Sequence, residues 1–340
     1  MKVLHITEAL GGGVQSAIRL YTEATPHLTH FVLGRKRANE DTGEFSSVSG
    51  VQLVPGSKIR FLSTVRQHVR RIDPDVIHLH SSIAGIARVV RLGGRPVVYS
   101  PHCFAFERTD LPRVARAIIR LIERALVTRT DCIFGVSPHE VLLAKQLGAD
   151  SAILVPNFVA GGKSYDRQSG SGTRVISTGR IGAQKDPAMY AEIARRLPHL
   201  QFFWLGDGEP ELKARLQGAG VHCPGWCSRE DVDHHLRGAD LYLHTGAWEA
   251  APIAVAEAVA TGLPVLSRSI ESMASLGYSL AGSTPGEIAQ TVDLFFRSPE
   301  LRSSTISATR QIAERYEGSK MAETLSGGYR LAQDKRGKFK

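Results

Sequence analysis

The chain has 340 residues, of which 42% are hydrophobic and 22% charged, so it can bury a large core, and neither a fibrous nor a disordered class fits. No apolar run approaches the roughly 18 to 20 residues of a membrane-spanning helix, and residues 1–15 do not resemble a signal peptide, so we expect a cytoplasmic protein. The formal net charge of +9 is uneven, because residues 1–150 contain 20 Lys and Arg against 13 Asp and Glu, whereas residues 151–340 contain 22 against 20.

Short hydrophobic runs alternate with helical stretches along the whole chain. Runs that predict strands in the first half are residues 2–6, 30–34, 51–54, 75–80, 96–100, 132–137 and 152–156. A Gly- and Ser-rich stretch then predicts a linker, and further strands are predicted at residues 174–180, 201–207, 221–226, 240–246 and 263–268. This alternation is typical of parallel sheets covered on both faces. We therefore predict an α/β protein of two doubly wound, Rossmann-like domains that face each other across a cleft, with ligands at the carboxyl ends of the strands.

The first motif is a glycine-rich loop after the first predicted strand. Residues 5–21, HITEALGGGVQSAIRLY, predict a strand, a loop containing Gly11, Gly12 and Gly13, and a helix. The glycines leave the backbone bare where the free N–H groups of the helix point, which suits an anion. The spacing is not that of the GxGxxG dinucleotide fingerprint, so a tight turn without a ligand is the alternative.

A cationic, amphipathic helix is predicted within residues 112–130. Its arginines fall on one side and its apolar residues on another: Arg113, Arg116, Arg120 and Arg124 against Val114, Ile118, Leu121, Ile122 and Ala125. Two interpretations stay open, namely a helix that covers a sheet with solvated arginines, or a helix whose apolar side meets an anionic membrane. Nucleic acid is not an expected partner, because no known binding motif or interleaved aromatic residues accompany the charges.

Two cations follow a predicted strand in the second half. In STGRIGAQKDP, residues 177–187, Arg180 and Lys185 lie five residues apart in a glycine-containing loop. Arg, through its planar fork, and Lys, as a point charge, could together clamp a diphosphate. Two solvated surface charges are the alternative.

Two carboxylates interrupt an otherwise apolar or small stretch, WEAAPIAVAEAVATGLPVL, residues 248–266. Glu249 is expected in the loop after a strand, and Glu257 in the following helix on the same side. Buried carboxylates are costly unless they accept hydrogen bonds, and vicinal sugar hydroxyls are suitable donors. A sugar-bearing ligand would therefore make these charges tolerable, and two structural glutamates that cap a helix or pair with Arg are the alternative.

Together these stretches resemble the retaining glycosyltransferases of family four, which have the GT-B fold. Glu249 and Glu257 are separated by seven residues and followed by ATGLPVL, similar to the family's E-x7-E signature. DVIHLHSS (75–82) resembles its D-V-x-H-x-H strand, YSPHCF (99–104) its T-x-H loop and ILVPNFVA (153–160) its approach to the linker. The stretch GRIGAQK (179–185) and the later FFWLGDGEP (202–210) resemble the core of its donor domain.

The resemblance implies roles for the matching positions of the second half. Arg180 and Lys185 would bind the donor diphosphate and stabilise it as the leaving group. Glu257 would bind the ribose hydroxyls of the nucleotide, and Glu249 would contact the donor sugar.

For the first half, the resemblance implies that His102 lines the reaction centre. The backbone amides of Gly12 and Gly13 would face the phosphates.

The implied domains are an acceptor-binding domain at residues 1–160 and a linker at residues 161–172. A donor-binding domain would follow at residues 173–318, and a C-terminal helix at residues 319–340 would cross back to the first domain.

The implied reaction moves a hexose from a nucleoside-diphosphate sugar, with UDP or GDP as the expected nucleotide. It would use no metal ion or other cofactor, because fixed cations and helix N-termini neutralise the departing diphosphate. The charge excess of the first half favours a polyprenyl-diphosphate-linked or other glycan acceptor, in bacterial surface polysaccharide synthesis. The protein would then lie peripherally on the inner face of the cell membrane, with residues 112–130 in contact with lipid.

Two alternatives stay open: a sugar-nucleotide epimerase of the same fold, and a non-catalytic homologue that binds nucleotide sugars. The chain also departs from the family pattern after the first glutamate. Glycine is usual at the next position, whereas this chain has Ala250, followed by Ala251. Phe158 and Ala160 replace a usual glycine and a frequent aspartate.

Overall fold

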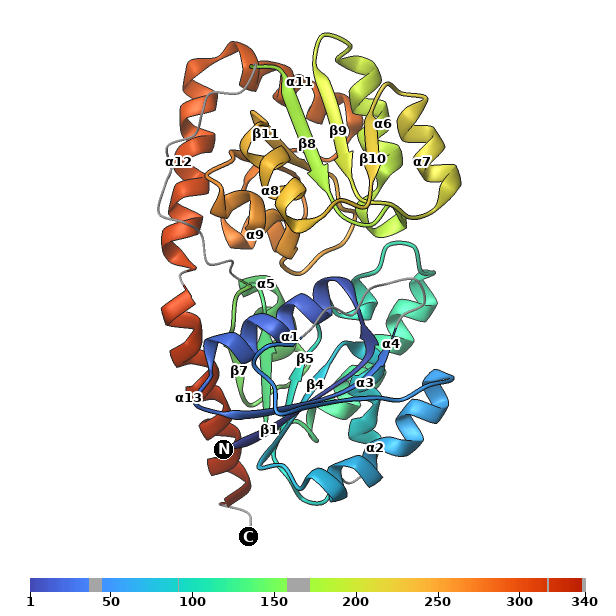
Figure 1. Ribbon diagram of the computed structural model, residues 1–340, viewed down its shortest axis with the longest axis vertical. Coiled ribbons are helices and arrows are strands. Elements are labelled where there is room, and N and C mark those ends of the chain that lie inside the picture. Colours follow the sequence, from blue (N-terminus) through green and yellow to red (C-terminus); the bar gives the residue numbers. More distant parts are fainter. Residues whose placement is uncertain (37–44, 91, 158–171, 317, 338–340) are drawn as a thin grey trace. The chain divides into compact units, whose positions relative to one another are not determined.

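The computed structural model describes residues 1–36, 45–90, 92–157, 172–316 and 318–337, which form two compact units (Figure 1). The N-terminal unit contains nearly all of the described residues up to 157 together with 318–337, and the C-terminal unit contains residues 172–316. The expected linker at 161–172, apart from Gly172, lies outside the described residues, as do Phe158 and Ala160.

The N-terminal unit is built on a seven-stranded parallel sheet with strand order β3-β2-β1-β4-β5-β6-β7. Its strands are β1 (Lys2–Leu10), β2 (Thr29–Lys36), β3 (Gly50–Leu53), β4 (Val76–His80), β5 (Val97–Ser100), β6 (Cys132–Gly135) and β7 (Ala152–Leu154). Central strands such as β4 and β5 are buried at every position. Burial at every position is expected for strands covered on both faces.

Helices on both faces supply this cover. They are α1 (Gly12–Ala24), α2 (Lys58–Ile72), α3 (Ser82–Gly85), η1 (Ile86–Val89), η2 (Ala105–Glu107), α4 (Arg113–Val127), α5 (Pro138–Gln146) and α13 (Gly318–Gly337). Ser57 and Ser137 cap α2 and α5, each accepting a hydrogen bond from a backbone N–H of the first turn.

The C-terminal helix α13 belongs to the N-terminal unit although it follows the whole C-terminal unit in sequence (Figure 1). Met321, Leu325 and Tyr329 are fully buried in a cluster with residues of the sheet. A Cβ at Gly328 would lie 2.5 Å from Ile153 and 2.6 Å from Phe134, so this approach of helix to sheet requires glycine.

The C-terminal unit has a six-stranded parallel sheet of order β10-β9-β8-β11-β12-β13. Its strands are β8 (Arg174–Thr178), β9 (Gln201–Leu205), β10 (His222–Gly225), β11 (Leu241–His244), β12 (Val265–Arg268) and β13 (Ser279–Gly282). Its helices are η3 (Ala183–Lys185), α6 (Pro187–Arg196), α7 (Pro210–Gln217), α8 (Arg229–Arg237), α9 (Ile253–Ala260), α10 (Glu271–Leu276), α11 (Pro285–Arg297) and α12 (Pro299–Arg315). The prediction of two doubly wound α/β domains is confirmed.

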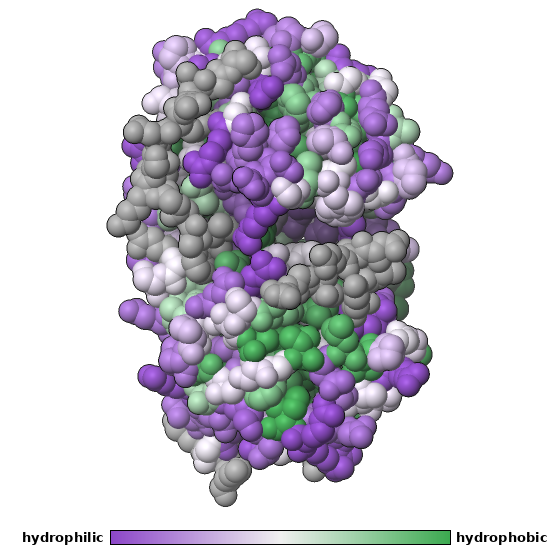
Figure 2. All heavy atoms as spheres, viewed as in Figure 1, coloured by the Kyte–Doolittle hydropathy of each residue, from purple (hydrophilic) through white to green (hydrophobic). Residues whose placement is uncertain are grey.

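Exposed apolar side chains are unevenly distributed between the units. Most of the large hydrophobic residues exposed in the described part of the chain belong to the N-terminal unit. Figure 2 shows one face of the molecule, on which hydrophobic residues gather over this unit. Such surfaces often mark an interaction site.

Candidate active site

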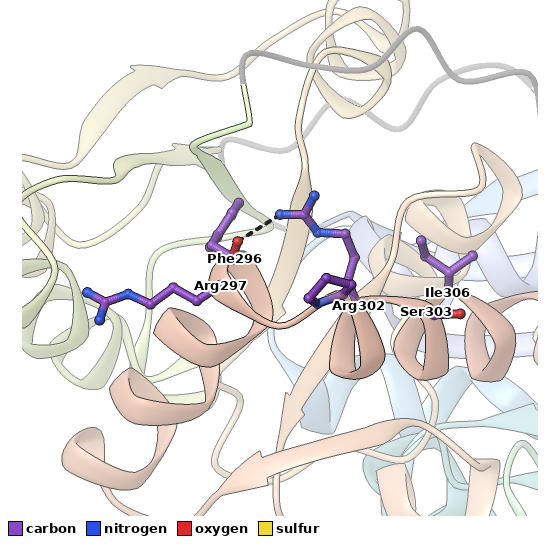
Figure 3. A pocket seen from close by; sticks show the side chains of 6 residues that line it. Phe296, Arg297, Arg302, Ser303 and Ile306 are labelled. Carbon is purple, nitrogen blue, oxygen red and sulfur yellow. Dashed lines mark hydrogen bonds between the residues drawn. The ribbon is translucent and has the colours of Figure 1, made fainter.

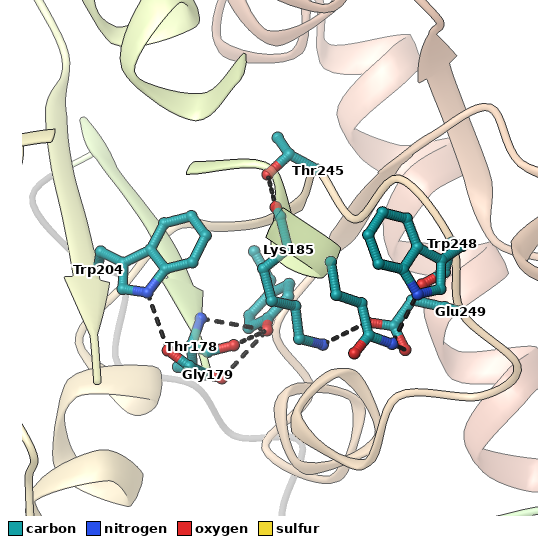
Figure 4. Close-up of polar contacts among 9 residues, drawn as sticks. Thr178, Gly179, Lys185, Trp204, Thr245, Trp248 and Glu249 are labelled. Carbon is teal, nitrogen blue, oxygen red and sulfur yellow. Dashed lines mark hydrogen bonds and ion pairs between the residues drawn. The ribbon is translucent and has the colours of Figure 1, made fainter. Parts of the chain in front are cut away.

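The carboxyl ends of β8 and β11 bring together Lys185 and Glu249, which are 64 residues apart in sequence. Lys185 ends the short helix η3 after β8, and Glu249 lies in the loop after β11. The Lys185 Nζ donates to Glu249 Oε1 at 2.6 Å, and Gln184 Nε2 donates to the other carboxylate oxygen at 3.2 Å (Figure 4). Because β8 and β11 are neighbours in a parallel sheet, their following loops meet at one edge.

Further contacts hold the two loops together. The Thr245 hydroxyl donates to the Lys185 carbonyl at 2.9 Å (Figure 4), and the Ala247 N–H donates to the Gln184 carbonyl at 2.8 Å. A Cβ at Gly246 would lie 2.6 Å from His244 Nε2 and 3.1 Å from Glu249 Cγ, so the loop can pass here only as glycine.

The ion pair explains why this apolar stretch contains Glu249. The side chains of Lys185 and Glu249 are 18% and 8% exposed, so both charges are largely removed from water. Burial alone would lower the pKa of Lys185, but the adjacent Glu249 carboxylate overrides it, and the pKa is raised. Lys185 is therefore a cation in this site at neutral pH.

Arg180 and Glu257 differ from this pair because neither forms a side-chain hydrogen bond or ion pair within the described residues. Arg180 is exposed in the loop after β8 and contributes a repulsive charge near Lys185. Glu257 is half-buried in α9, where burial raises the pKa of its carboxyl against a smaller opposing effect from Arg229. Among the described residues, Arg180 and Glu257 are therefore a cation and a carboxylate that a ligand could engage.

Sequence reasoning missed three polar residues of this site: Gln184, His244 and Thr245. Gln184 lies between Arg180 and Lys185, so its position next to Lys185 was the available signal. The buried His244 has a pKa held well below its ordinary value by burial and by the charges of Lys185 and Arg268, so it is neutral.

The first-half candidates lie in the N-terminal unit. Gly12 and Gly13 are exposed at the start of α1, whose N-cap, Gly11, provides no side-chain hydrogen bond. Gly11 and Gly12 have φ values of 149° and 54°, conformations that favour glycine. The first-turn N–H groups are therefore left for another acceptor.

His102 lies in the loop after β5 in a strained backbone conformation, with φ of 51°. Its Nε2 lies 2.9 Å from His80 Nδ1, and burial lowers the pKa of His102 to about 4. The next residue, Cys103, has φ of 83° and donates its N–H to Glu140 Oε1 at 2.7 Å. Glu140, which sequence reasoning missed, thereby holds the loop, and burial raises its pKa to about 7.

Helix α4 turns its apolar stripe to solvent. Val114, Ile118, Leu121 and Ile122 are 72%, 53%, 66% and 47% exposed. Glu123 instead faces the protein, where its carboxylate accepts hydrogen bonds from buried Arg88 at 2.7 Å and from Tyr99 at 3.0 Å. The interpretation in which this apolar side packs against the sheet is therefore wrong, because the side that faces inward carries Glu123, Leu126 and Val127 instead.

A pocket lies where α11 ends and α12 begins (Figure 3). It is lined by Phe296, Arg297, Pro299, Arg302, Ser303 and Ile306. The end of α11 adjoins the amino ends of the parallel strands, because a helix in such a fold runs antiparallel to the strands that it covers. This pocket is therefore separate from the residues at the carboxyl ends.

Among the helices that the structure describes, none combines the length and apolarity needed to cross a membrane.

Comparisons with known proteins match both units. Residues 12–157 match the glycosyl transferase 4-like domain, and residues 167–312 match glycosyl transferases group 1. An uncharacterized 41.2 kDa protein in the cps region of Klebsiella pneumoniae is 25% identical over 305 residues, covering 80% of this chain and 82% of the relative.

Two further proteins are similar. The UDP-Gal:alpha-D-GlcNAc-diphosphoundecaprenol alpha-1,3-galactosyltransferase of Escherichia coli is 30% identical over 224 residues, covering 56% of this chain and 57% of the relative. The solved structure of sucrose-phosphate synthase from Thermosynechococcus elongatus matches with a TM-score of 0.77 at 13% identity, covering 97% of this chain and 98% of that chain. The structural likeness shows a shared fold.

Proposed function

The chain belongs to the GT-B glycosyltransferases, with a glycosyl transferase 4-like domain followed by a group 1 domain, and on this premise we propose that it is a retaining, metal-independent hexosyltransferase. Its donor is a nucleoside-diphosphate sugar and its acceptor a glycan or polyprenyl-diphosphate-linked saccharide. The product belongs to a bacterial surface polysaccharide.

One observation carries the proposal: the loops after the neighbouring strands β8 and β11 bring Lys185 into contact with Glu249. Arg180 lies in the first of these loops, and Glu257 lies in the helix α9 that follows the second. Lys185 and Glu249 are in contact, Arg180 is exposed, and the carboxylate of Glu257 has no protein partner within the described residues. Cations and a carboxylate that await partners suit a ligand with both a diphosphate and vicinal hydroxyls.

Each side chain then has a distinct task. Arg180 and Lys185 neutralise the charge that develops on the departing diphosphate, which is the kind of fixed electrostatic stabilisation that often dominates catalysis. Glu257 accepts hydrogen bonds from the ribose hydroxyls. Glu249 holds Lys185 in place and accepts from a hydroxyl of the donor sugar.

The alanines after Glu249 are compatible with this assignment. Glycine would be essential there if the loop used a positive φ, but neither Ala250 nor Ala251 has one. Ala250 is also buried, so its methyl group is accommodated. This supports transfer over the alternative of a non-catalytic homologue.

We propose that the nucleotide of the donor is UDP and that a lipid diphosphate anchors the acceptor. The Escherichia coli relative is named for UDP-Gal and a diphosphoundecaprenol acceptor. Exposed apolar residues on α4 lie beside the exposed Arg113, Arg120 and Arg124, which is the arrangement of a helix that lies on an anionic membrane surface. We propose that α4 brings the enzyme to its lipid-linked acceptor at the inner face of the cell membrane.

The reaction is tested first by a thermal-shift screen of UDP, GDP, ADP and their sugars. A ligand at about a hundred times its dissociation constant stabilises the folded state by about 2.7 kcal/mol. The stabilising donor is then incubated with a polyprenyl-diphosphate-linked saccharide, with and without EDTA, and the product anomer is determined by NMR.

The expected result is nucleotide release and a new glycosidic bond that keeps the donor anomer, unchanged by EDTA. Isomerised sugar without nucleotide release would identify an epimerase. Binding without turnover over an acceptor panel would identify a non-catalytic homologue, and an inverted anomer or loss of activity in EDTA would refute retention or metal independence.

Membrane contact is tested by co-sedimentation with vesicles that contain anionic phospholipid. The double variant Arg113→Glu/Arg124→Glu should bind less than the wild type, since each basic residue near such a surface contributes about 1 kcal/mol. The control is Arg66→Glu/Arg70→Glu, which makes the same charge change on exposed residues of α2. Equal loss in both variants, or no binding of the wild type at low salt, would refute the role of α4.

A further inference from the structure

Four imidazoles form a continuous hydrogen-bonded chain across the N-terminal sheet. They come from neighbouring strands in spatial order: His30 from β2, His5 from β1, His80 from β4, and His102 from the loop after β5. The nitrogen–nitrogen distances are 3.1 Å for His5 Nε2 to His30 Nδ1, 2.9 Å for His80 Nε2 to His5 Nδ1, and 2.9 Å for His102 Nε2 to His80 Nδ1. We call these four residues the imidazole chain.

Every member of the imidazole chain is a neutral imidazole at pH 7. His5, His30 and His80 are almost completely buried, and His102 is half-buried. Burial lowers the pKa of all four residues. A neutral imidazole has one N–H donor and one bare nitrogen, so each contact in the chain has one direction.

The direction of these hydrogen bonds is set at His30, the end of the imidazole chain that lies farthest along the sheet from His102. His30 Nε2 lies 3.0 Å from the Thr25 carbonyl oxygen, which can only accept. It also lies 3.0 Å from the Thr25 hydroxyl, whose own proton is donated to the Tyr21 carbonyl at 2.8 Å. Both contacts require the proton of His30 to be on Nε2.

The remaining protons follow in sequence. The bare Nδ1 of His30 accepts from His5 Nε2–H, the bare Nδ1 of His5 accepts from His80 Nε2–H, and the bare Nδ1 of His80 accepts from His102 Nε2–H. His102 is therefore left with a bare Nδ1, for which the described residues provide no hydrogen-bond partner.

We propose that His30, His5 and His80 are positioning residues that lock His102 in its Nε2–H tautomer, so that Nδ1 of His102 accepts a hydrogen bond from a hydroxyl group of the bound sugar. The tautomer assignment follows from the hydrogen bonds of these buried, neutral imidazoles. The sugar contact rests on the proposed function.

A metal site is the alternative for part of this cluster, because His5, His78 and His80 have ligand atoms within 4.8 Å of one another. Both nitrogens of His5 and of His80 are engaged within the imidazole chain. Those of His78 lie 2.9 Å from the Tyr329 hydroxyl and 2.8 Å from the Ser100 hydroxyl. A metal ion would have to displace these bonds, so the geometry favours the hydrogen-bonded chain.

The proposal is tested by NMR of the full-length protein labelled with 15N at histidine. Long-range 1H–15N spectra distinguish a protonated from a bare ring nitrogen, and a His102→Gln spectrum assigns the signals of His102. The expected wild-type result is a single Nε2–H tautomer of His102 at pH 7. An Nδ1–H tautomer or a mixture in the wild type would overturn the proposal, whether or not the protein transfers sugar.

Propagation along the imidazole chain is tested far from His102, with a matched pair of variants. His30→Phe removes the acceptor for His5 and should give mixed tautomers at His102. His30→Gln offers a carbonyl oxygen as acceptor and should retain the wild-type spectrum. A His102 spectrum unchanged in His30→Phe would overturn the positioning role.

Kinetics separate this role from simple packing. In His30→Phe we expect kcat to fall by about 10-fold, the effect expected when one hydrogen bond to the reacting sugar is lost, with the Kd for UDP unchanged. His30→Gln should recover most of the activity. Equal activity of the two variants would overturn the catalytic part of the proposal, whereas a wild type without transferase activity would refute only the proposed function.

Discussion

Lys185→Met is expected to destabilise the C-terminal unit, because it leaves the Glu249 carboxylate buried without its cation. The two side chains are only 18% and 8% exposed, and their charged atoms are 2.6 Å apart. Removing one partner of a buried ion pair costs about 3 to 5 kcal/mol. Since Gln184 still donates to Glu249 at 3.2 Å, we expect the lower end of this range, about 3 kcal/mol.

Tryptophan fluorescence during thermal unfolding reports on the C-terminal unit. The three tryptophans of the chain, Trp204, Trp226 and Trp248, all belong to it. For a unit of this size, the expected loss lowers Tm by roughly 6 to 12 °C. Lys213→Met is the control, since its ion pair with Asp207 is 26% and 35% exposed. Breaking that more exposed pair should cost no more than about 1 kcal/mol.

The double variant Lys185→Met/Glu249→Leu distinguishes an unpaired charge from lost packing. Replacing both buried charges with apolar side chains is often neutral for stability, so most of the lost Tm should return while transfer stays abolished. The reasoning would be refuted if Lys185→Met and Lys213→Met lowered Tm equally. It would also be refuted if the double variant lowered Tm by the sum of the decreases in its two single variants.

Three further predictions concern the two units separately. Arg180→Ala should change stability by no more than about 0.5 kcal/mol, because Arg180 is exposed, yet lower kcat by about 100-fold or more; near wild-type nucleotide release would remove its assigned role. Because burial raises the pKa of Glu257, the affinity for UDP, measured by calorimetry, should fall as the pH drops through that raised pKa. The variant Glu257→Gln should bind UDP weakly and without this pH dependence. Identical pH profiles of the wild type and the variant would contradict the assignment. Burial holds the pKa values of His5, His78 and His80 well below 6.5, so below pH 6.5 the unfolded chain binds more protons than the folded protein. The free energy of unfolding should therefore fall by up to about 1.4 kcal/mol per histidine for each pH unit below 6.5. Urea unfolding followed by circular dichroism checks this, and equal stability at pH 7.5 and 5.5 would exclude it.

Local sequence pattern was sufficient to predict the layered α/β fold. A strand such as β1 begins with a short, mainly apolar run because both faces of a parallel sheet are covered, and this signal is contained within a few residues. The edge strand β13, Ser279–Gly282, was not predicted. It is only four residues long, and Ser279 and Gly282 occupy its two ends, so it contains too few apolar residues to give a strand signal.

The candidate site could be predicted where its residues share a short segment. Arg180 and Lys185 lie in one loop, and Glu249 and Glu257 in one loop and helix, so spacing alone indicated their proximity. The contact between Lys185 and Glu249 could not be predicted from composition or spacing, because it depends on β8 and β11 being neighbours in the sheet.

The imidazole chain shows the same limit more strongly. His80 and His102 belong to recognisable motifs, but His5 and His30 have no local feature that links them to the site. They meet because β2, β1 and β4 are adjacent strands, and adjacency in a sheet is a property of topology.

Helix α4 separates the two kinds of information within a single element. Its sequence determined a helix with an arginine side and an apolar side, because helical periodicity is a local property of the backbone. Only the tertiary structure decided that the apolar side faces solvent. Arg88 and Tyr99, from elsewhere in the fold, bind Glu123, and Leu126 and Val127 are buried on the same side of the helix. Leaving the buried Glu123 unpaired would be costly, so this side faces inward although the longer apolar stripe lies on another.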